Sequence, residues 1–119
     1  MTLALLGAAA CRQPLHFSTL QVGRSLNGDN TIATHTTRFK PDDTIYASVL
    51  TDRTGSSTIH ARWSYNGHVV SETEKRVSYK GDGATEFHFQ SADGFPRGDY
   101  KVEIFVDDKP AAARDFRVE

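Results

Sequence analysis

The sequence predicts an all-β domain in which about seven antiparallel strands form a β-sandwich or a barrel. Two observations support this class: apolar and polar residues alternate along several segments, and no segment has the spacing of an amphipathic helix. Turn residues also recur at intervals of roughly ten residues. With 119 residues, of which 38% are hydrophobic and 24% charged, the composition suits one globular domain.

Each expected strand is an alternating run bounded by turn residues. These runs cover residues 15–22, 31–39, 44–50, 57–65, 68–79, 85–90, 99–106 and 112–118. The turn-rich stretch 27–30 separates the first two runs. Asn66-Gly67 predicts a hairpin with a type I′ turn, because both central residues of that turn need positive φ. The return strand contains "SETEK", residues 71–75, which is typical of an edge strand guarded by charge.

The alternation also separates a core face from an outer face. Residues 44–50 direct Ile45, Ala47 and Val49 to one face, and residues 99–106 do the same with Tyr100, Val102, Ile104 and Val106. Phe87, Phe89, Phe116 and Val118 complete the expected core. Tyr46, Leu50 and Phe105 fall on the opposite face, where we expect either a partner surface or a cover formed by Leu15 and Phe17.

Two aromatic residues favour a sandwich of the immunoglobulin-like, or fibronectin III-like, kind. Trp63 lies in the middle of the third core strand, and Tyr100 opens the sixth directly after a corner that contains Pro96 and Gly98. In immunoglobulin-like domains a buried tryptophan packs between the sheets, and a tyrosine at this corner hydrogen-bonds back across the turn. The chain has one cysteine, so no intramolecular disulfide can join the sheets.

That cysteine, Cys11, ends the segment "MTLALLGAAAC", which resembles the lipobox of bacterial lipoproteins. The apolar run is too short to cross a bilayer as a helix. The segment departs from the pattern at two points, since no Lys or Arg precedes Cys11 and Ala8 occupies the usual place of Leu. We predict a truncated lipoprotein signal over residues 1–11, lipidation at Cys11 and a single domain over residues 12–119. The alternative is an Ala-rich tail on a cytosolic protein.

Four segments together resemble the immunoglobulin-like domain of uncharacterised bacterial lipoproteins: "FKPDDTIYASV", "ARWSYNGHVV", "FHFQSADGFPRGDYKVEIFVDDKP" and "RDFRV". The last two strands of that family often read P-x-G-x-Y-x-V-x-V-x-x-D-G and then F-x-V. Its places are filled by Pro96, Gly98, Tyr100, Val102, Ile104, Asp107, Phe116 and Val118, while Asp108 replaces the usual hairpin glycine. The resemblance implies a bacterial envelope location. In a Gram-negative cell the resemblance implies the outer membrane, facing the periplasm or the cell surface, because Arg12 is not the Asp that signals inner-membrane retention.

The composition argues against several functions. Fourteen Lys and Arg balance fifteen Asp and Glu without a basic stripe, so we expect no nucleic-acid partner. We expect no enzyme and no cofactor, because no Gly-x-Ser-x-Gly elbow occurs and Cys11 lies at the expected lipid attachment point. The carboxylates of residues 71–75 fit edge protection better than a catalytic pair.

Three functional hypotheses remain. The first is a binding or assembly module, anchored in the membrane by lipid and directed at an envelope protein or a glycan. The second is a periplasmic carrier of a metal or small ligand that uses His60 and His88, which share a site only if their strands are neighbours. The third is adhesion to host cells through Arg97-Gly98-Asp99, although a turn alone accounts for these three residues.

Overall fold

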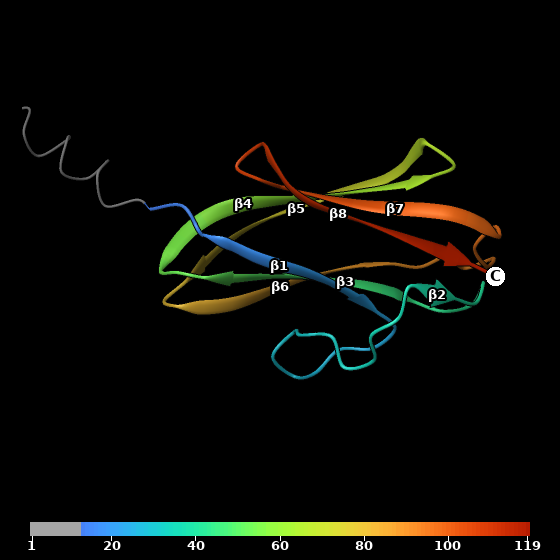
Figure 1. Cartoon of the computed structure of the whole chain (residues 1–119), viewed down its shortest axis with the longest axis horizontal. Coiled ribbons are helices and arrows are strands. Elements are labelled where there is room, and N and C mark those ends of the chain that lie inside the picture. Colours follow the sequence, from blue (N-terminus) through green and yellow to red (C-terminus); the bar gives the residue numbers. More distant parts are fainter. Residues whose placement is uncertain (1–12) are drawn as a thin grey trace, which may run out of the picture.

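The computed structural model describes residues 13–119, which form two β-sheets packed face to face (Figure 1). The expected all-β sandwich is confirmed, with eight strands in the described residues. They are β1 (Phe17–Gly23), β2 (Arg38–Phe39), β3 (Ile45–Asp52), β4 (Gly55–Tyr65), β5 (His68–Tyr79), β6 (Asp82–Phe89), β7 (Gly98–Val106) and β8 (Lys109–Val118). No helix occurs between residues 13 and 119, and hence none there that could span a membrane.

One sheet has three strands in the order β1-β3-β6, and the other has five in the order β2-β8-β7-β4-β5. All neighbouring strands are antiparallel except β2 and β8, which are parallel. The chain changes sheet at each of the three connections from β1 to β4, and again between β5 and β6 and between β6 and β7. These crossings put strands that are distant in the sequence into one sheet, as immunoglobulin-like sandwiches do.

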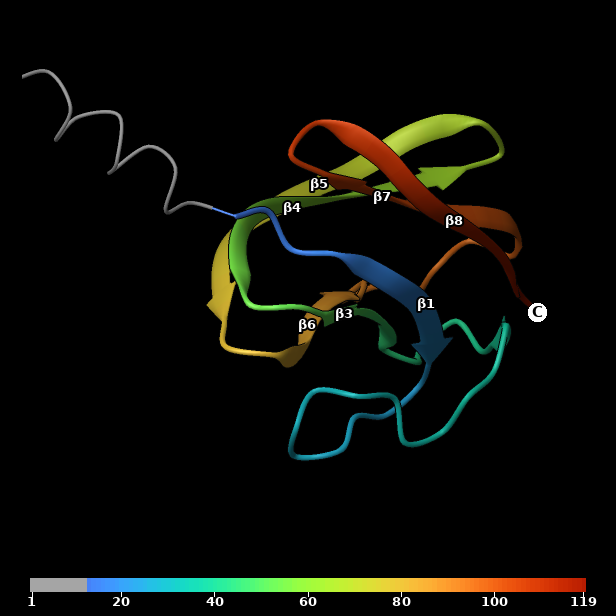
Figure 2. The same cartoon turned by 60° about the vertical axis from the view of Figure 1, so that its left-hand side comes forward.

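The prediction of a strand over residues 31–39 is wrong except at its end, where Arg38–Phe39 forms β2. Residues 24–37 instead fold back outside the three-stranded sheet, beneath β1 and β3 in Figure 2. The loop bonds to itself, with the Ala33 amide donating to the Ser25 carbonyl at 2.9 Å. It also bonds to the sheet, because Ser48 Oγ donates to the Asn30 carbonyl at 2.7 Å. These bonds satisfy polar groups without a strand partner.

The core joins the two sheets through stacked aromatic rings. Trp63 of β4 is 1% exposed and stacks on Phe89 with ring centroids 5.2 Å apart. Within the five-stranded sheet, Tyr100 of β7 stacks on Phe116 of β8 at 5.4 Å, and Val102 of β7 is fully buried. The hydroxyl of Tyr100 donates to the Pro96 carbonyl at 2.6 Å, which is the hydrogen bond of a tyrosine corner.

Two hairpins have left-handed residues at their turns. Asn66 and Gly67 have φ of 47° and 85°, as a type I′ turn requires. Asp107 and Asp108 have φ of 50° and 68°, so the β7–β8 hairpin takes the same conformation without a glycine. The carboxylate of Asp107 accepts hydrogen bonds from Ser57 Oγ at 2.8 Å and from the Thr58 amide at 3.0 Å. Those bonds hold the strained turn against β4.

The two aspartates of this turn should therefore respond to glycine in opposite ways. We expect Asp108→Gly to raise the free energy of unfolding by about 0.5–1 kcal/mol, because glycine adopts positive φ without steric cost. Asp107→Gly should lower it, because the two hydrogen bonds to β4 are lost. Urea denaturation of both variants measures the difference, and a stabilising Asp107→Gly would contradict this assignment.

Candidate functional site

The predicted lipid attachment point, Cys11, lies outside the described residues, but the chain just after it is firmly held. The Gln13 carbonyl accepts a hydrogen bond from the Ser56 amide at 2.8 Å. The Leu15 amide donates to Ser57 Oγ at 2.9 Å, and the Leu15 side chain is buried. The start of the described chain is therefore attached to the first residues of β4.

The tripeptide Arg97-Gly98-Asp99 lies where the chain enters β7. Gly98 has φ of 143° and is the first residue of the strand. The Arg97 carbonyl accepts a hydrogen bond from the Tyr65 hydroxyl at 3.0 Å. The Asp99 carboxylate forms an ion pair with Arg117 of the adjacent β8. The aspartate therefore has a partner within the sheet, and the tripeptide is part of a strand entry.

The two candidate metal ligands lie in different sheets, His60 on β4 and His88 on β6. The condition for a shared site, neighbouring strands, is not met. His60 Nε2 lies 2.7 Å from Glu72 Oε1, and His88 Nδ1 lies 3.0 Å from Glu86 Oε1. Within residues 13–119, no group of three or more His, Cys, Asp or Glu side chains is placed to hold a metal ion.

The carboxylates of the "SETEK" segment belong to a charged network on the outer face of the five-stranded sheet. Glu72 Oε1 also lies 3.5 Å from Arg62 Nε, and His60 Nδ1 lies 3.8 Å from Glu74 Oε1. The hydrogen bond from His60 is the main cause that holds the pKa of Glu72 below its usual value. Strand β5 pairs only with β4, so the segment lies on an edge strand, as its composition suggested.

Of the three residues expected on the outer face, Phe105 and Tyr46 contact neighbouring side chains, and Leu50 lines a surface cavity. The Phe105 ring lies 4.7 Å from the Arg62 guanidinium and 5.7 Å from the His60 ring. Tyr46 packs on His88 with centroids 6.0 Å apart. The expected cover by Leu15 and Phe17 is wrong, because Leu15 belongs to the core and Phe17 packs against it.

A contact between the sheets, Lys75 with Glu86, was missed by sequence reasoning because the charges lie on strands of different sheets. Lys75 Nζ donates to Glu86 Oε2 at 2.9 Å and to the Glu86 carbonyl at 2.5 Å. It also lies 5.1 Å from the centre of the Phe87 ring. The Glu86 side chain is only 19% exposed. The pair closes the open side of the sandwich between β5 and β6.

Because Glu86 is charged at neutral pH and paired, the free energy of unfolding should depend on pH. Burial raises the pKa of Glu86, but hydrogen bonds from Lys75 and His88 outweigh it, so the pKa lies below its usual 4.5. A depressed pKa gives stabilisation that is present above pH 4.5 and is lost as the pH falls through the folded-state value. We expect Glu86→Gln to lower the free energy of unfolding by about 1 kcal/mol at neutral pH.

The difference in the free energy of unfolding between Glu86→Gln and the parent should shrink as the pH falls below 4.5. Urea denaturation of this variant and the parent across the acidic range measures it. Glu74→Gln is a suitable control, because its carboxylate is 64% exposed and has only a distant partner. A loss in Glu86→Gln that is independent of pH would contradict the charge-based explanation.

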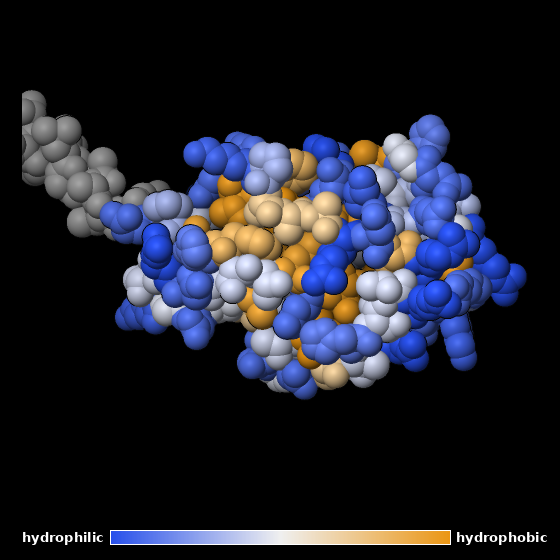
Figure 3. Space-filling model, in the orientation of Figure 1, coloured by the Kyte–Doolittle hydropathy of each residue, from blue (hydrophilic) through white to orange (hydrophobic). Residues whose placement is uncertain are grey.

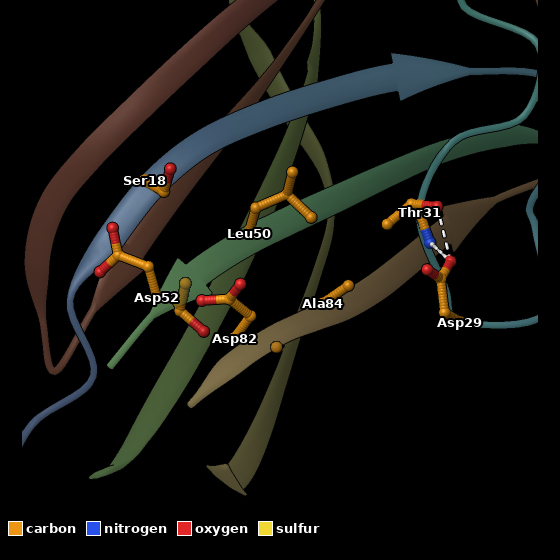
Figure 4. A pocket seen from close by; sticks show the side chains of 9 residues that line it. Ser18, Asp29, Thr31, Leu50, Asp52, Asp82 and Ala84 are labelled. Carbon is orange, nitrogen blue, oxygen red and sulfur yellow. Dashed lines mark hydrogen bonds between the residues drawn. The ribbon is translucent and has the colours of Figure 1, made fainter. Parts of the chain in front are cut away.

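A cavity of about 390 Å³ lies on the outer face of the three-stranded sheet. Figure 4 shows Leu50 and Ala84 between Asp52 and Asp82 at one end and Asp29 at the other. Asp29 accepts hydrogen bonds from the hydroxyl and amide of Thr31, at 2.6 Å and 3.0 Å, which hold its pKa below the usual value. Asp52 lies 2.8 Å from His16. No local sequence pattern predicts this cavity, because it forms where Asp29 and Thr31 of the loop 24–37 meet residues of β1, β3 and β6.

The comparisons with known proteins concern the fold. No protein-family model and no curated protein sequence matches the chain. An immunoglobulin-like protein of Pseudomonas aeruginosa superposes with a TM-score of 0.61 at 13% identity, covering 91% of this chain and 98% of that one. A β-glucosidase of Listeria innocua matches with a TM-score of 0.53 at 8% identity, but the chain spans only 16% of that enzyme. The chain has the immunoglobulin-like β-sandwich fold.

Proposed function

We propose that the chain is a non-catalytic binding or assembly module, held at a bacterial envelope membrane by lipid on Cys11. The observation that carries the proposal is the place of the cysteine relative to the fold. It follows small residues in a lipobox-like segment, and only Arg12 separates it from Gln13, whose carbonyl is bonded to β4. Two residues span at most about 7 Å, so a lipid on Cys11 would act as a very short tether.

Such a tether would orient the sandwich on the membrane. The β3–β4, β5–β6 and β7–β8 connections lie at the end where the described chain starts, and the β4–β5 hairpin lies at the other end (Figure 1). The first end would face the lipid. The distal hairpin carries the exposed Val69 and Val70, whose side chains are 52% and 49% accessible. Apolar side chains on a distal hairpin suit contact with an envelope protein or a glycan.

Fractionation of a bacterial host tests the anchor. The parent, expressed with its natural upstream start, should sediment with membranes, resist a high-salt wash and be released by detergent. Cys11→Ser should move the protein to the soluble fraction, because no acyl chain can be attached. A soluble parent that behaves like Cys11→Ser would overturn the proposed anchor.

A further inference from the structure

Each sheet ends in strands that have unpaired backbone groups, and such edges recruit a further strand unless they are protected. Strand β6 is protected by side chains from β5. The Tyr79 hydroxyl donates to the Ala84 carbonyl at 3.1 Å, and Lys75 Nζ donates to the Glu86 carbonyl at 2.5 Å. Peptide groups of alternate residues point to the same edge of a strand. Ala84 and Glu86 are therefore successive carbonyls on the edge of β6 that has no strand partner, and both already accept hydrogen bonds from side chains.

Strand β5 is protected by charge. Glu72, Glu74 and Arg76 alternate along its outer face, and Lys75 points between the sheets. Lys75 already pairs with Glu86, so this edge offers an incoming strand exposed charges of both signs and no unmatched inward charge. This edge and that of β6 are therefore poor sites for strand addition.

Strand β8 is different, because its partner on the outer edge is the short β2. The Arg117 amide donates to the Thr37 carbonyl, and the Glu119 amide to the Phe39 carbonyl, both at 2.9 Å. Ala113 and Asp115 present their peptide groups on the same edge as Arg117, because the direction alternates along a strand. Neither has a backbone partner on this edge among residues 13–119. The outer edge of β8 around Ala113 and Asp115 can therefore form backbone hydrogen bonds with a further strand.

Apolar surface lies open beside this edge. Figure 1 shows β1 and β8 on the side of the molecule that faces the reader. Figure 3, in the same orientation, shows an apolar surface between these two strands, surrounded by polar side chains. Phe17, Ala111 and Ala112 pack against the core but are only partly buried. An added strand that placed apolar side chains here would bury this surface.

The cationic side chain of Arg114 lies beside this apolar surface, between β8 and β1. Arg114 points to the same side of β8 as the buried Phe116 and Val118. It lines a cavity of about 370 Å³ together with Thr19, Gln21, Val22, His35, Thr36 and Thr37. None of the ion pairs formed within the described range includes Arg114. A carboxylate on an added strand would supply the missing counter-charge.

We propose that the free edge of β8 around Ala113 and Asp115 receives an extended segment of a partner protein as a further strand. An acidic side chain of that segment pairs with Arg114, and its apolar side chains cover Phe17 and the alanines of β8. This inference rests on the proposed binding function and adds to the distal hairpin a second contact surface, with the chemistry of its partner.

Peptide titration followed by NMR tests the inference, with the full chain carrying Cys11→Ser so that no lipid contributes. The probes are the capped peptides TVTDTVT and TVTKTVT. The acidic peptide should shift the amide signals of Ala113 and Asp115 and slow their hydrogen exchange. It should bind about tenfold more tightly than the lysine peptide, because only the acidic one can pair with Arg114. Arg114→Glu should reverse this preference, and the control Arg76→Glu on β5 should leave it unchanged.

The inference would be overturned by the absence of a saturable shift on β8, or by an unchanged preference in Arg114→Glu. Shifts confined to the Asn66–Val70 hairpin would also overturn it, but they would support the proposed binding function. The membrane anchor is tested separately by the fractionation of Cys11→Ser. Failure of the edge site and failure of the anchor can therefore be told apart.

Discussion

Replacing Trp63 with alanine should lower the free energy of unfolding by about 3–5 kcal/mol, the largest loss expected for a single side chain in this domain. Trp63 is 1% exposed, stacks on Phe89 and meets the edge of Phe116 with centroids 6.0 Å apart. Its removal leaves a cavity between the sheets that the surrounding strands cannot close. A domain of this size has about 5–15 kcal/mol of stability, so the variant will be close to unfolding.

Trp63→Phe provides the matched control, because it keeps an aromatic ring in the same place and should lose less than half as much stability. Trp63 is the only tryptophan, so unfolding of the variants is followed by far-UV circular dichroism in urea. A loss of less than about 1 kcal/mol in Trp63→Ala would mean that the ring is not buried between the sheets.

Gly23→Ala should lower the free energy of unfolding by about 1–3 kcal/mol, because there is no room for a methyl group at the end of β1. A Cβ at this position would lie 2.1 Å from the Thr34 carbonyl oxygen and 2.4 Å from Cγ2 of Ile32. Both groups belong to the loop 24–37, so the methyl group would push the loop off the sheet. The Arg24 amide, which donates to the Thr34 carbonyl at 3.0 Å, should then exchange its hydrogen faster.

Gly28→Ala is the control for this prediction, because a Cβ there has no other atom within 4 Å. It lies in the same loop, and its unfolding free energy should change by less than about 0.5 kcal/mol. Urea denaturation and amide hydrogen exchange of both variants measure the effects. Equal losses in the two variants would show that the loop does not pack closely on Gly23.

Much of the fold can be predicted from the sequence because its signals are local. The alternation of Ile45, Ala47 and Val49 identifies β3, and Asn66-Gly67 identifies the β4–β5 hairpin. The strand predicted over residues 31–39 is wrong except at its end, because the threonines and alternating apolar residues of this segment fit a strand as well as a loop. Its conformation depends on contacts with Gly23 and Ser48, which adjacent positions in the sequence do not reveal.

The candidate sites depend more strongly on pairings between distant segments. His60 and His88 have the same local pattern, and only the assignment of β4 and β6 to different sheets separates them. The Lys75–Glu86 contact and the exposure of Arg114 likewise arise from the way the two sheets meet. A single sequence contains no local signal for such contacts, since its periodicity gives the face of a strand and not its neighbour.

We propose that lipid on Cys11 holds the immunoglobulin-like module at an envelope membrane. Intact mass spectrometry of the protein, produced with its natural upstream start and recovered from the membrane fraction of a bacterial host, tests it most directly. We predict a species that begins at Cys11 and carries a diacylglyceryl group, and that is absent from Cys11→Ser. An unmodified chain that retains Met1 in the soluble fraction would contradict the claim.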